Sequence, residues 1–189
     1  MNTPRSHYDI ASQVFHWLTA MAVLTAFILG PEHFGRAMRQ GMDPATHWDI
    51  VLHESLGLLA MALSVLRLVW WVLRPAKPRF DMPDWMQKAS QATHGLLWVL
   101  LLAVPLSALL ALGGKGHPLT LLGGLRIDDM PWITHSALVE LTDWGDMHSL
   151  LGDAILWLSG LHAVAAIFHH FVLKDGVLRS MLPARKKAN

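Results

Sequence analysis

Cysteine is absent from the sequence of 189 residues, and its absence excludes several kinds of site. Without cysteine the chain can form no disulfide, no thiolate metal site and no cysteine-ligated iron–sulfur cluster. It also cannot attach a haem through the thioether bonds of a Cys-x-x-Cys-His motif. Any haem in this protein must therefore be held without a covalent bond.

Charged residues are scarce as well. They make up 15% of the sequence, against 53% hydrophobic residues, whereas a soluble domain usually carries about 25% charged residues. The formal net charge is +1 with neutral histidines, and the only strongly basic run is at the C-terminus, so nucleic acid is not an expected partner. This composition predicts a membrane protein, and the length suits a single domain covering residues 1–189.

The hydrophobic residues gather in four runs, at residues 10–31, 50–73, 89–114 and 147–173. Each run is long enough for a helix to cross the hydrocarbon core of a bilayer, which takes about 20 residues. The first run exceeds the apolar part of a typical signal peptide and carries a candidate functional histidine, so we expect a retained helix. The sequence therefore predicts an all-α fold, an integral membrane four-helix bundle in a lipid bilayer.

Lysine and arginine are distributed unevenly between the two sides of this bundle. Eleven of the fifteen lie before the first run, around the connection between the second and third runs, or after the fourth run, and four lie in the other two loops. Because cytoplasmic loops carry an excess of Lys and Arg, both termini are predicted to be cytoplasmic. The long loop between the third and fourth runs is then periplasmic, and a short interfacial helix is expected within it.

Histidine is unusually frequent, with twelve copies. Seven lie within the apolar runs, and five of them are candidates for intramembrane sites, where an ionisable side chain is costly and must find a partner: His16, His53, His94, His148 and His162. His148 and His162 lie fourteen residues apart on one predicted helix, so they face within about 40° of each other at depths about 21 Å apart. The predicted topology brings His16 to the depth of His162 and His53 to the depth of His148.

Two histidine pairs, one in each half of the bilayer, are what two six-coordinate haem irons require. Gly57 and Gly152 each follow a paired histidine by four residues, so they lie one turn further on the same face, where a flat macrocycle can approach the backbone. Zinc fits poorly, because depths about 21 Å apart prevent four imidazoles from surrounding one ion. Two alternatives remain: histidines that hydrogen-bond between helices, and a haem-free transporter that uses them as a proton relay.

At these histidines the sequence resembles a known family. The segments FHW around His16, HESLG around His53, MHSLLG around His148 and GLHAVAAIFHHFVLKDGVLRSM around His162 are similar to the bacterial cytochrome b561 family, and the similarity covers residues 5–182. One branch of this family is superoxide oxidase. The resemblance implies two non-covalent b haems (iron protoporphyrin IX), ubiquinone as electron partner and a location in the bacterial inner membrane. It also implies the haem ligand pairs His16 with His162 and His53 with His148, the pairs that depth alone selects.

Further polar residues on the predicted cytoplasmic side are weaker candidates. Arg67 and Arg74 lie one heptad apart on the second helix, where they can pair with the propionates of a haem or contact lipid headgroups. His94 is expected to pack near the cytoplasmic haem or to hydrogen-bond a propionate. His169 shares the haem-facing side of the fourth helix. By the family resemblance, it is with Lys174 the candidate for binding the quinone and delivering a proton.

The predicted periplasmic loops are acidic, with eight Asp and Glu residues against four Lys and Arg. Such a surface repels superoxide and attracts a cationic redox protein. Superoxide is then favoured as donor only if a local basic patch forms, for example near Lys115 and Arg126. The sequence thus predicts an oxidoreductase that passes single electrons between a periplasmic donor and ubiquinone, with superoxide as donor in the oxidase branch. The alternative is a haem b anchor subunit for a separate dehydrogenase or periplasmic redox protein, without catalysis of its own.

Overall fold

The computed structural model describes residues 7–30, 40–73, 78 and 80–183. Within these residues four helices are long and apolar enough to cross a membrane, as the sequence predicts. Three of them begin two to five residues earlier than the predicted runs, and the first ends at residue 28. The helices are α1 (Ile10–Ile28), α3 (Trp48–Leu73), α4 (Asp84–Gly114) and α6 (Trp144–Phe168), and α6 continues into a π-helical turn, η4 (His169–Leu173).

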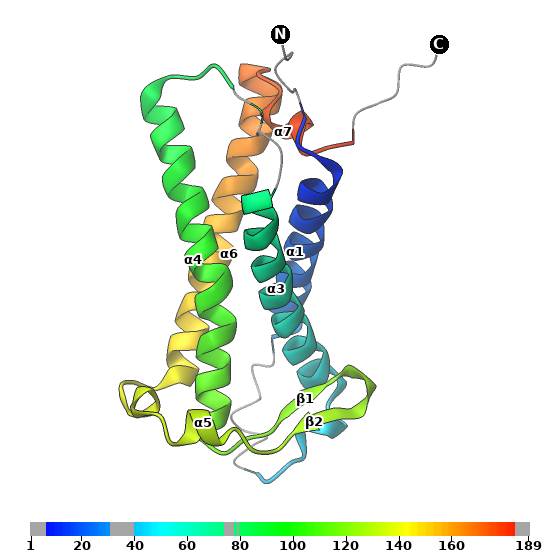
Figure 1. Cartoon of the computed structure of the whole chain (residues 1–189), viewed down its shortest axis with the longest axis vertical. Helices are drawn as coiled ribbons and strands as arrows, with labels where there is room; N and C mark the ends of the chain where they lie inside the picture. The colour runs from blue at the N-terminus through cyan, green and yellow to red at the C-terminus, as the bar shows by residue number, and fades with distance from the viewer. Residues whose placement is uncertain (1–6, 31–39, 74–77, 79, 184–189) are drawn as a thin grey trace.

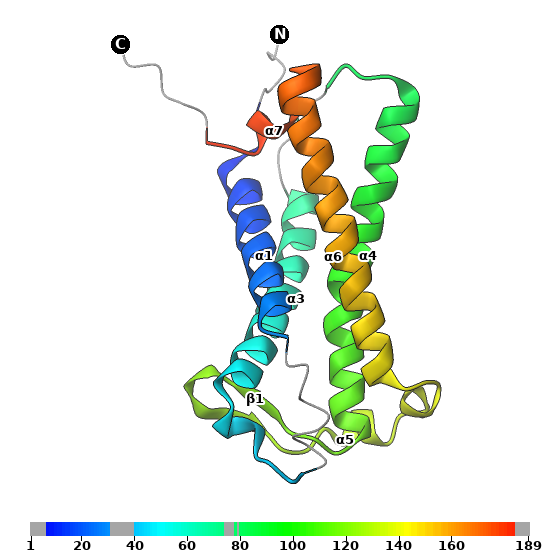
Figure 2. The same ribbon diagram turned by 180° about the vertical axis from the view of Figure 1, so that it is seen from behind.

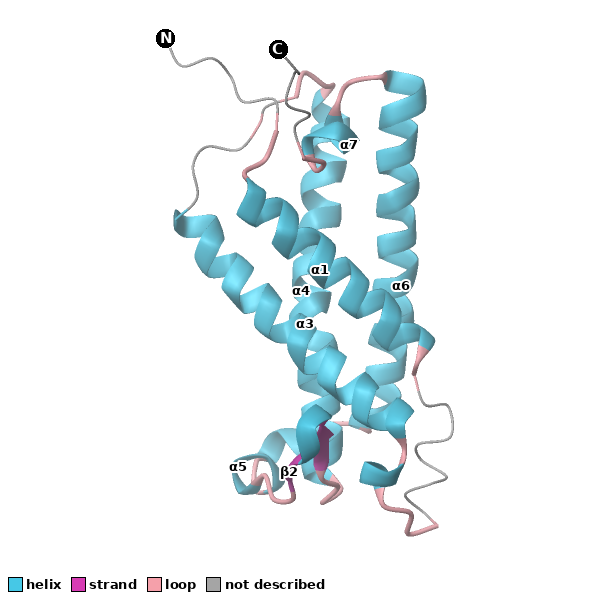
Figure 3. Cartoon of the chain, turned by 90° about the vertical axis from the view of Figure 1, so that its right-hand side faces the viewer, coloured by secondary structure: helices cyan, strands magenta, loops and turns pink. Residues whose placement is uncertain are grey.

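The four helices form two pairs. α1 packs along α3, and α4 packs along α6 (Figure 1). α3 also touches α4, whereas α1 and α6 contact each other only sparsely. The same two pairs are seen from behind in Figure 2, and Figure 3 shows that they run at an angle to each other. A seam therefore separates the α1–α3 pair from the α4–α6 pair.

The distribution of side chains is that of a membrane bundle. Buried positions on α1 and α3 are mostly small residues, among them Ala22, Ala60 and Ser64. Large apolar side chains point outward, and Trp157 on α6 is 73% exposed. Lipid tails are as apolar as these side chains, and small residues let helices approach closely. The exposed apolar surface is thus suited to a lipid bilayer.

The loop between α4 and α6 covers one end of the bundle, which we call the hairpin end (Figure 1). This loop contains a β-hairpin, which the sequence did not predict and which is a small departure from the all-α expectation. Gly123 and Gly124 both have positive φ, so a tight turn that other residues rarely adopt lets the flanking residues pair. An interfacial helix was expected further along this loop, and two short helical turns form there. The elements are β1 (Leu119–Leu121), η2 (Leu122–Gly124), β2 (Leu125–Ile127), α5 (Pro131–Thr134) and η3 (Ala137–Glu140); η1 (Pro44–Thr46) precedes α3.

Hydrogen bonds fasten β1 and the turn that follows it to α3. The backbone N–H and the hydroxyl of Thr120 donate to Oε2 of Glu54, at 2.6 and 2.8 Å. The N–H of Leu122 donates to Oγ of Ser55 at 2.9 Å. Leu119 is buried in an apolar cluster with residues of α4. The hairpin therefore covers this end of the bundle as a fixed element.

The opposite end, which we call the terminal end, holds both ends of the described chain. α7 (Val177–Ser180) folds back toward α1. The Gln13 side-chain amide donates to the carbonyls of Ser180 and Leu182, at 3.1 and 3.0 Å, and the indole N–H of Trp17 donates to the carbonyl of Met181 at 2.9 Å. Both ends of the described chain thus lie on one side of the bundle, as four spans require; that this side is cytoplasmic stays a prediction.

Candidate functional site

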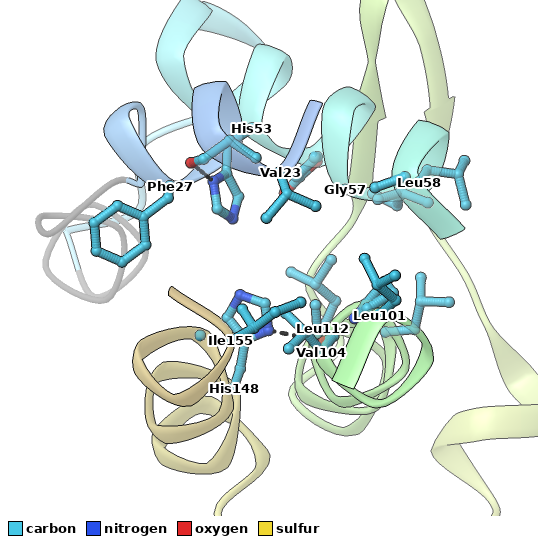
Figure 4. A pocket seen from close by; sticks show the side chains of 18 of the residues that line it. Val23, Phe27, His53, Gly57, Leu58, Leu101, Val104, Leu112, His148 and Ile155 are labelled. Carbon is cyan, nitrogen blue, oxygen red and sulfur yellow. Dashed lines mark hydrogen bonds between the residues drawn. The ribbon is translucent and has the colours of Figure 1, made fainter. Parts of the chain in front are cut away.

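The four predicted ligand histidines come together in two pairs. His53 on α3 faces His148 on α6 near the hairpin end, with ring centroids 6.0 Å apart (Figure 4). His16 on α1 and His162 on α6 lie nearer the terminal end, with ring centroids 6.3 Å apart. Each pair joins the α1–α3 side to the α4–α6 side across the seam. We call them the hairpin-end pair and the terminal-end pair.

The ring separation in each pair matches the space that one metal ion needs. An imidazole nitrogen lies about 2 Å from the metal that it binds, and the centre of its ring lies roughly 1 Å further away. Two imidazoles on opposite sides of one ion therefore have ring centroids about 6 Å apart. The rings are inclined at 71° and 86° to each other, so they do not stack. Both pairs have the spacing of axial ligands to a single iron.

Backbone carbonyls orient the two rings of the hairpin-end pair. Nδ1 of His53 lies 2.7 Å from the carbonyl oxygen of Ala26, and Nδ1 of His148 lies 3.0 Å from that of Val104. A carbonyl can only accept, so each Nδ1 carries the proton and each Nε2 keeps its lone pair. Ala26 belongs to the last turn of α1, where carbonyls lack a partner within the helix. Proteins commonly orient metal-binding imidazoles by such hydrogen bonds.

A cavity of about 910 Å³, part of which opens to the surroundings, lies between the rings of the hairpin-end pair (Figure 4). Both predicted glycines, Gly57 and Gly152, line it, and a Cβ added to either would meet no atom within 4 Å. The remaining lining is largely apolar, which suits a flat apolar cofactor. Glu54 is the only charged residue among the described residues of the lining. The sequence analysis predicted no role for Glu54 in the site.

The terminal-end pair has different neighbours. His94 on α4 lies 5.0 Å from His162 between ring centroids. The guanidinium carbon of Arg67 on α3 lies 5.1 Å from the ring centroid of Trp98, which follows His94 by one turn. Arg67 also interacts electrostatically with the rings of both histidines of this pair. Two of the weaker candidates, His94 and Arg67, therefore lie beside the terminal-end pair.

The predicted quinone residues lie where α6 ends. His169 opens η4, and its Nδ1 hydrogen-bonds with the carboxylate of Asp175, which leaves Nε2 for another partner. Lys174 and Gly176 on either side of Asp175 have positive φ, so the chain turns sharply and returns the carboxylate to His169. Lys174 is exposed. Sequence reasoning missed Asp175, because only this turn brings it to the histidine.

The remaining predicted propionate residue, Arg74, lies outside the described residues. Of the two arginines predicted to pair with haem propionates, the structure therefore describes only Arg67.

The lysine and the arginine that the structure describes at the hairpin end, Lys115 and Arg126, lie in ion pairs. Nζ of Lys115 lies 3.2 Å from the carboxylate of Asp143. The guanidinium of Arg126 lies 2.6 Å from Asp43 and 2.5 Å from Asp128. Lys115 and Arg126 therefore do not form the local basic patch that would favour superoxide, because each cation is next to at least one carboxylate.

Comparison with known proteins decides the family. A family model described as prokaryotic cytochrome b561 matches residues 7–184. The chain belongs to this family. Among curated relatives, Cytochrome b561 homolog 2 of Escherichia coli strain K12 is 32% identical over 184 residues, which cover 96% of this chain and 93% of the relative.

Two further relatives match at similar length. Cytochrome b562 of Cereibacter sphaeroides is 29% identical, with 97% of this chain and 99% of the relative covered. Probable superoxide oxidase CybB of Yersinia pestis is 27% identical, with 90% and 93% covered. The resemblance that the histidine motifs carry is therefore confirmed as membership of the cytochrome b561 family.

Membership makes this chain a membrane electron-transfer protein that binds haem b, which removes the haem-free transporter from the alternatives. The hairpin-end pair fits such a group. Its imidazoles present free Nε2 atoms, the cavity between them is apolar, and the two glycines leave room for the edge of a macrocycle. A haem held by two imidazoles is six-coordinate and exchanges single electrons.

Proposed function

We propose that this cytochrome b561 family member holds two non-covalent b haems and passes single electrons across the bacterial inner membrane. His53 and His148 would hold one haem, and His16 and His162 the other. A donor would act at the hairpin end, facing the periplasm, and ubiquinone at the terminal end, facing the cytoplasm. This orientation rests on the distribution of Lys and Arg in the sequence.

One observation carries the proposal: two histidine pairs, each with the ring separation of one iron, share α6 at different depths. His148 and His162 are fourteen residues apart, or about 21 Å along the helix. One metal ion cannot serve both pairs at that distance, so the arrangement supports two separate centres. Their alignment along a single helix supports a path for electrons from one face of the membrane to the other.

The carboxylate of Asp175 supports a role for His169 in quinone reduction. Reduction of a quinone to a quinol takes two electrons and two protons. The carboxylate at Nδ1 orients the imidazole of His169, so its Nε2 is left to hydrogen-bond a quinone oxygen. Lys174 is exposed beside this pair and can contact the same ligand.

The donor has two candidates. One relative is named as a probable superoxide oxidase, which favours superoxide. The ion pairs of Lys115 and Arg126 favour the second candidate, which is a separate dehydrogenase or a cationic periplasmic redox protein. This chain would then be its haem b anchor subunit. Both cations are next to carboxylates, so they do little to attract an anion.

Stopped-flow spectroscopy of the purified protein tests this proposal. The oxidised protein is mixed with superoxide, and the α band of reduced haem b is followed; water-soluble ubiquinone is then added. Rapid reduction followed by reoxidation supports the oxidase. If superoxide does not reduce the protein, the protein is reduced with dithionite instead. Reoxidation by ubiquinone then supports the anchor subunit. Reduced protein that ubiquinone does not reoxidise contradicts both forms of the proposal.

A further inference from the structure

The two histidine pairs have charged neighbours of opposite sign, an acid at the hairpin-end pair and a guanidinium at the terminal-end pair. Glu54 lines the cavity at the hairpin-end pair and follows His53 directly in the sequence. Arg67 lies over the ring of Trp98, one turn after His94, whose ring stands 5.0 Å from that of His162 in the terminal-end pair. Both residues lie on α3, thirteen positions apart, which is about 20 Å along the helix. One helix therefore presents an acid at one pair and a base at the other.

Hydrogen bonds to the hairpin fix the position of the Glu54 carboxyl group. Oε2 accepts two hydrogen bonds from Thr120, one from the backbone N–H and one from the hydroxyl. Hydrogen bonds that donate to a carboxylate are stronger than those to a neutral acceptor. The side chain is held between β1 and the cavity, so its charge has a fixed position relative to the hairpin-end pair.

Arg67 keeps its positive charge, because a guanidinium does not lose its proton in proteins. Its side chain is partly buried and lies over the ring of Trp98 on the neighbouring helix. That contact holds the guanidinium on the seam side of α3, close to His94 and to the terminal-end pair.

These charges act on any redox centre held by the pairs. A centre that gains an electron loses one unit of positive charge, so a nearby anion disfavours reduction and a nearby cation favours it. In the weakly polar interior of a bundle such interactions are several times stronger than in water. The other described basic groups of the hairpin end, Lys115 and Arg126, are in ion pairs with acids, so they largely cancel there.

We propose that Glu54 and Arg67 set the order of the two reduction potentials, with the terminal-end centre the higher. This inference rests on the proposed function, because it requires two haems. One electron leaves the hairpin-end centre, which is oxidised, and enters the terminal-end centre, which is reduced, without a proton or another reactant. Glu54 and Arg67 are positioning charges for this transfer, and they drive the electron toward the end that carries His169.

Potentiometric titration of the purified protein, followed at the haem α band, tests the inference. Wild-type protein should titrate in two one-electron steps. Glu54→Gln keeps an oxygen acceptor for Thr120 and removes the charge, so it should raise the lower potential and leave the higher one in place. Arg67→Gln should lower the higher potential and leave the lower one in place. Each variant should reduce the equilibrium constant between the centres about tenfold, or about 59 mV.

Controls that retain the charge distinguish electrostatics from a change of structure. Arg67→Lys and Thr120→Val should keep the gap close to the wild-type value. The inference would be overturned if Glu54→Gln binds two haems and both reduction potentials stay unchanged. It would also be overturned if the difference between the two potentials widens. Either result would leave the proposed function intact. A protein with fewer than two haems would overturn the proposed function itself. If Arg67→Gln does not fold, the shift of the lower potential in Glu54→Gln decides.

Discussion

The two histidine pairs share α6, yet their surroundings differ. At the hairpin end, carbonyl groups hold both Nδ1 atoms, two glycines open the cavity, and a carboxylate borders it. At the terminal end, a third histidine and a guanidinium stand beside the rings, and no hydrogen bond to a ring nitrogen of His16 or His162 is found within the described residues. Two similar histidine pairs that share one helix thus lie in different electrostatic environments.

Different segments of the chain cover the two ends of the bundle. The β-hairpin covers the hairpin end and is fastened through Glu54, a residue of the cavity itself. The segment around α7 covers the terminal end and is fastened through Gln13 and Trp17, which flank His16 on α1. Each cover is therefore tied to a helix at a position close to a paired histidine. Changes at one end are expected to affect that end first.

Loss of one paired histidine should change the haem content of the two ends most strongly. His148→Ala removes an imidazole of the hairpin-end pair, so the haem content should fall from two to one per chain while the terminal-end haem remains. The pyridine haemochrome assay on purified protein measures the ratio. His135→Ala, in the loop near α5 and away from both pairs, is the control and should keep two haems. Loss of both haems in His148→Ala would show that the pairs do not form independent sites.

Filling the space beside a glycine should have the next largest effect. Gly152→Leu projects a side chain into the cavity of the hairpin-end pair, so most of the haem at that end should be lost. Gly160→Leu is the matched control, because Gly160 lies on the exposed face of the same helix and a Cβ there also meets no atom. Haem content and α-band shape report both variants. Equal haem content in the two variants would contradict the assignment of this cavity to the cofactor.

Detaching the cover of the terminal end should cost less. Gln13→Ala removes hydrogen bonds to the carbonyls of Tyr8, Ser180 and Leu182, so the protein should lose about 2 kcal/mol of stability. Unfolding in mixed micelles of a mild detergent and SDS measures this loss. Gln91→Ala, at an exposed position on α4, should change stability little. We also expect faster proteolysis after α6 in Gln13→Ala; protection equal to wild type would argue against this cover.

Loosening the cover of the hairpin end should have a smaller effect. Thr120→Val removes the hydroxyl that donates to Glu54 and keeps the backbone hydrogen bond, for a loss of about 1 kcal/mol. Hydrogen exchange of the β1 amides should rise, while exchange around α7 stays the same. Thr142→Val, at an exposed position, is the control. An equal rise at both ends would contradict the view that the two covers are separate.

The smallest expected effect is a pH dependence at the start of α6. Hydrogen bonds from the backbone N–H of Asp146 and from Lys115 lower the pKa of Asp143 below its ordinary value. Its stabilising contribution is therefore present above the ordinary pKa and is lost as the pH falls through the lower, folded pKa. Asp143→Asn keeps an N-cap acceptor for α6 but cannot titrate. Its thermal midpoint should fall less than that of wild type between neutral pH and about pH 3; equal falls would contradict this role of Asp143.

Sequence patterns predicted the features that depend on the long helices, namely the spans and the histidine pairs. Apolar runs gave the four spans, and the spacing of His148 and His162 together with the alternating direction of the helices gave both pairs. The patterns failed where a turn brings distant residues together. Glu54 meets Thr120 across 66 positions through the unpredicted hairpin, and Asp175 reaches His169 only because the chain reverses after η4. The carbonyls that orient His53 and His148 belong to the backbone, so no residue type marks them.

The charge of the loops shows a further limit of sequence reasoning. Composition described the loops of the hairpin end as acidic, but it did not show whether Lys115 and Arg126 could form the basic patch that superoxide would need. Counting charges does not reveal which of them are neighbours, and here Lys115 lies beside Asp143 and Arg126 beside Asp43, carboxylates that are distant in sequence.

The central claim is that the two histidine pairs hold two separate haems. The most direct measurement is the haem content of the purified protein by the pyridine haemochrome assay, with the spin state of the oxidised protein read by electron paramagnetic resonance. We expect two haem b per chain, both low-spin, as two imidazole ligands to each iron require. One haem per chain, or a high-spin signal from a haem with an open coordination position, would contradict it.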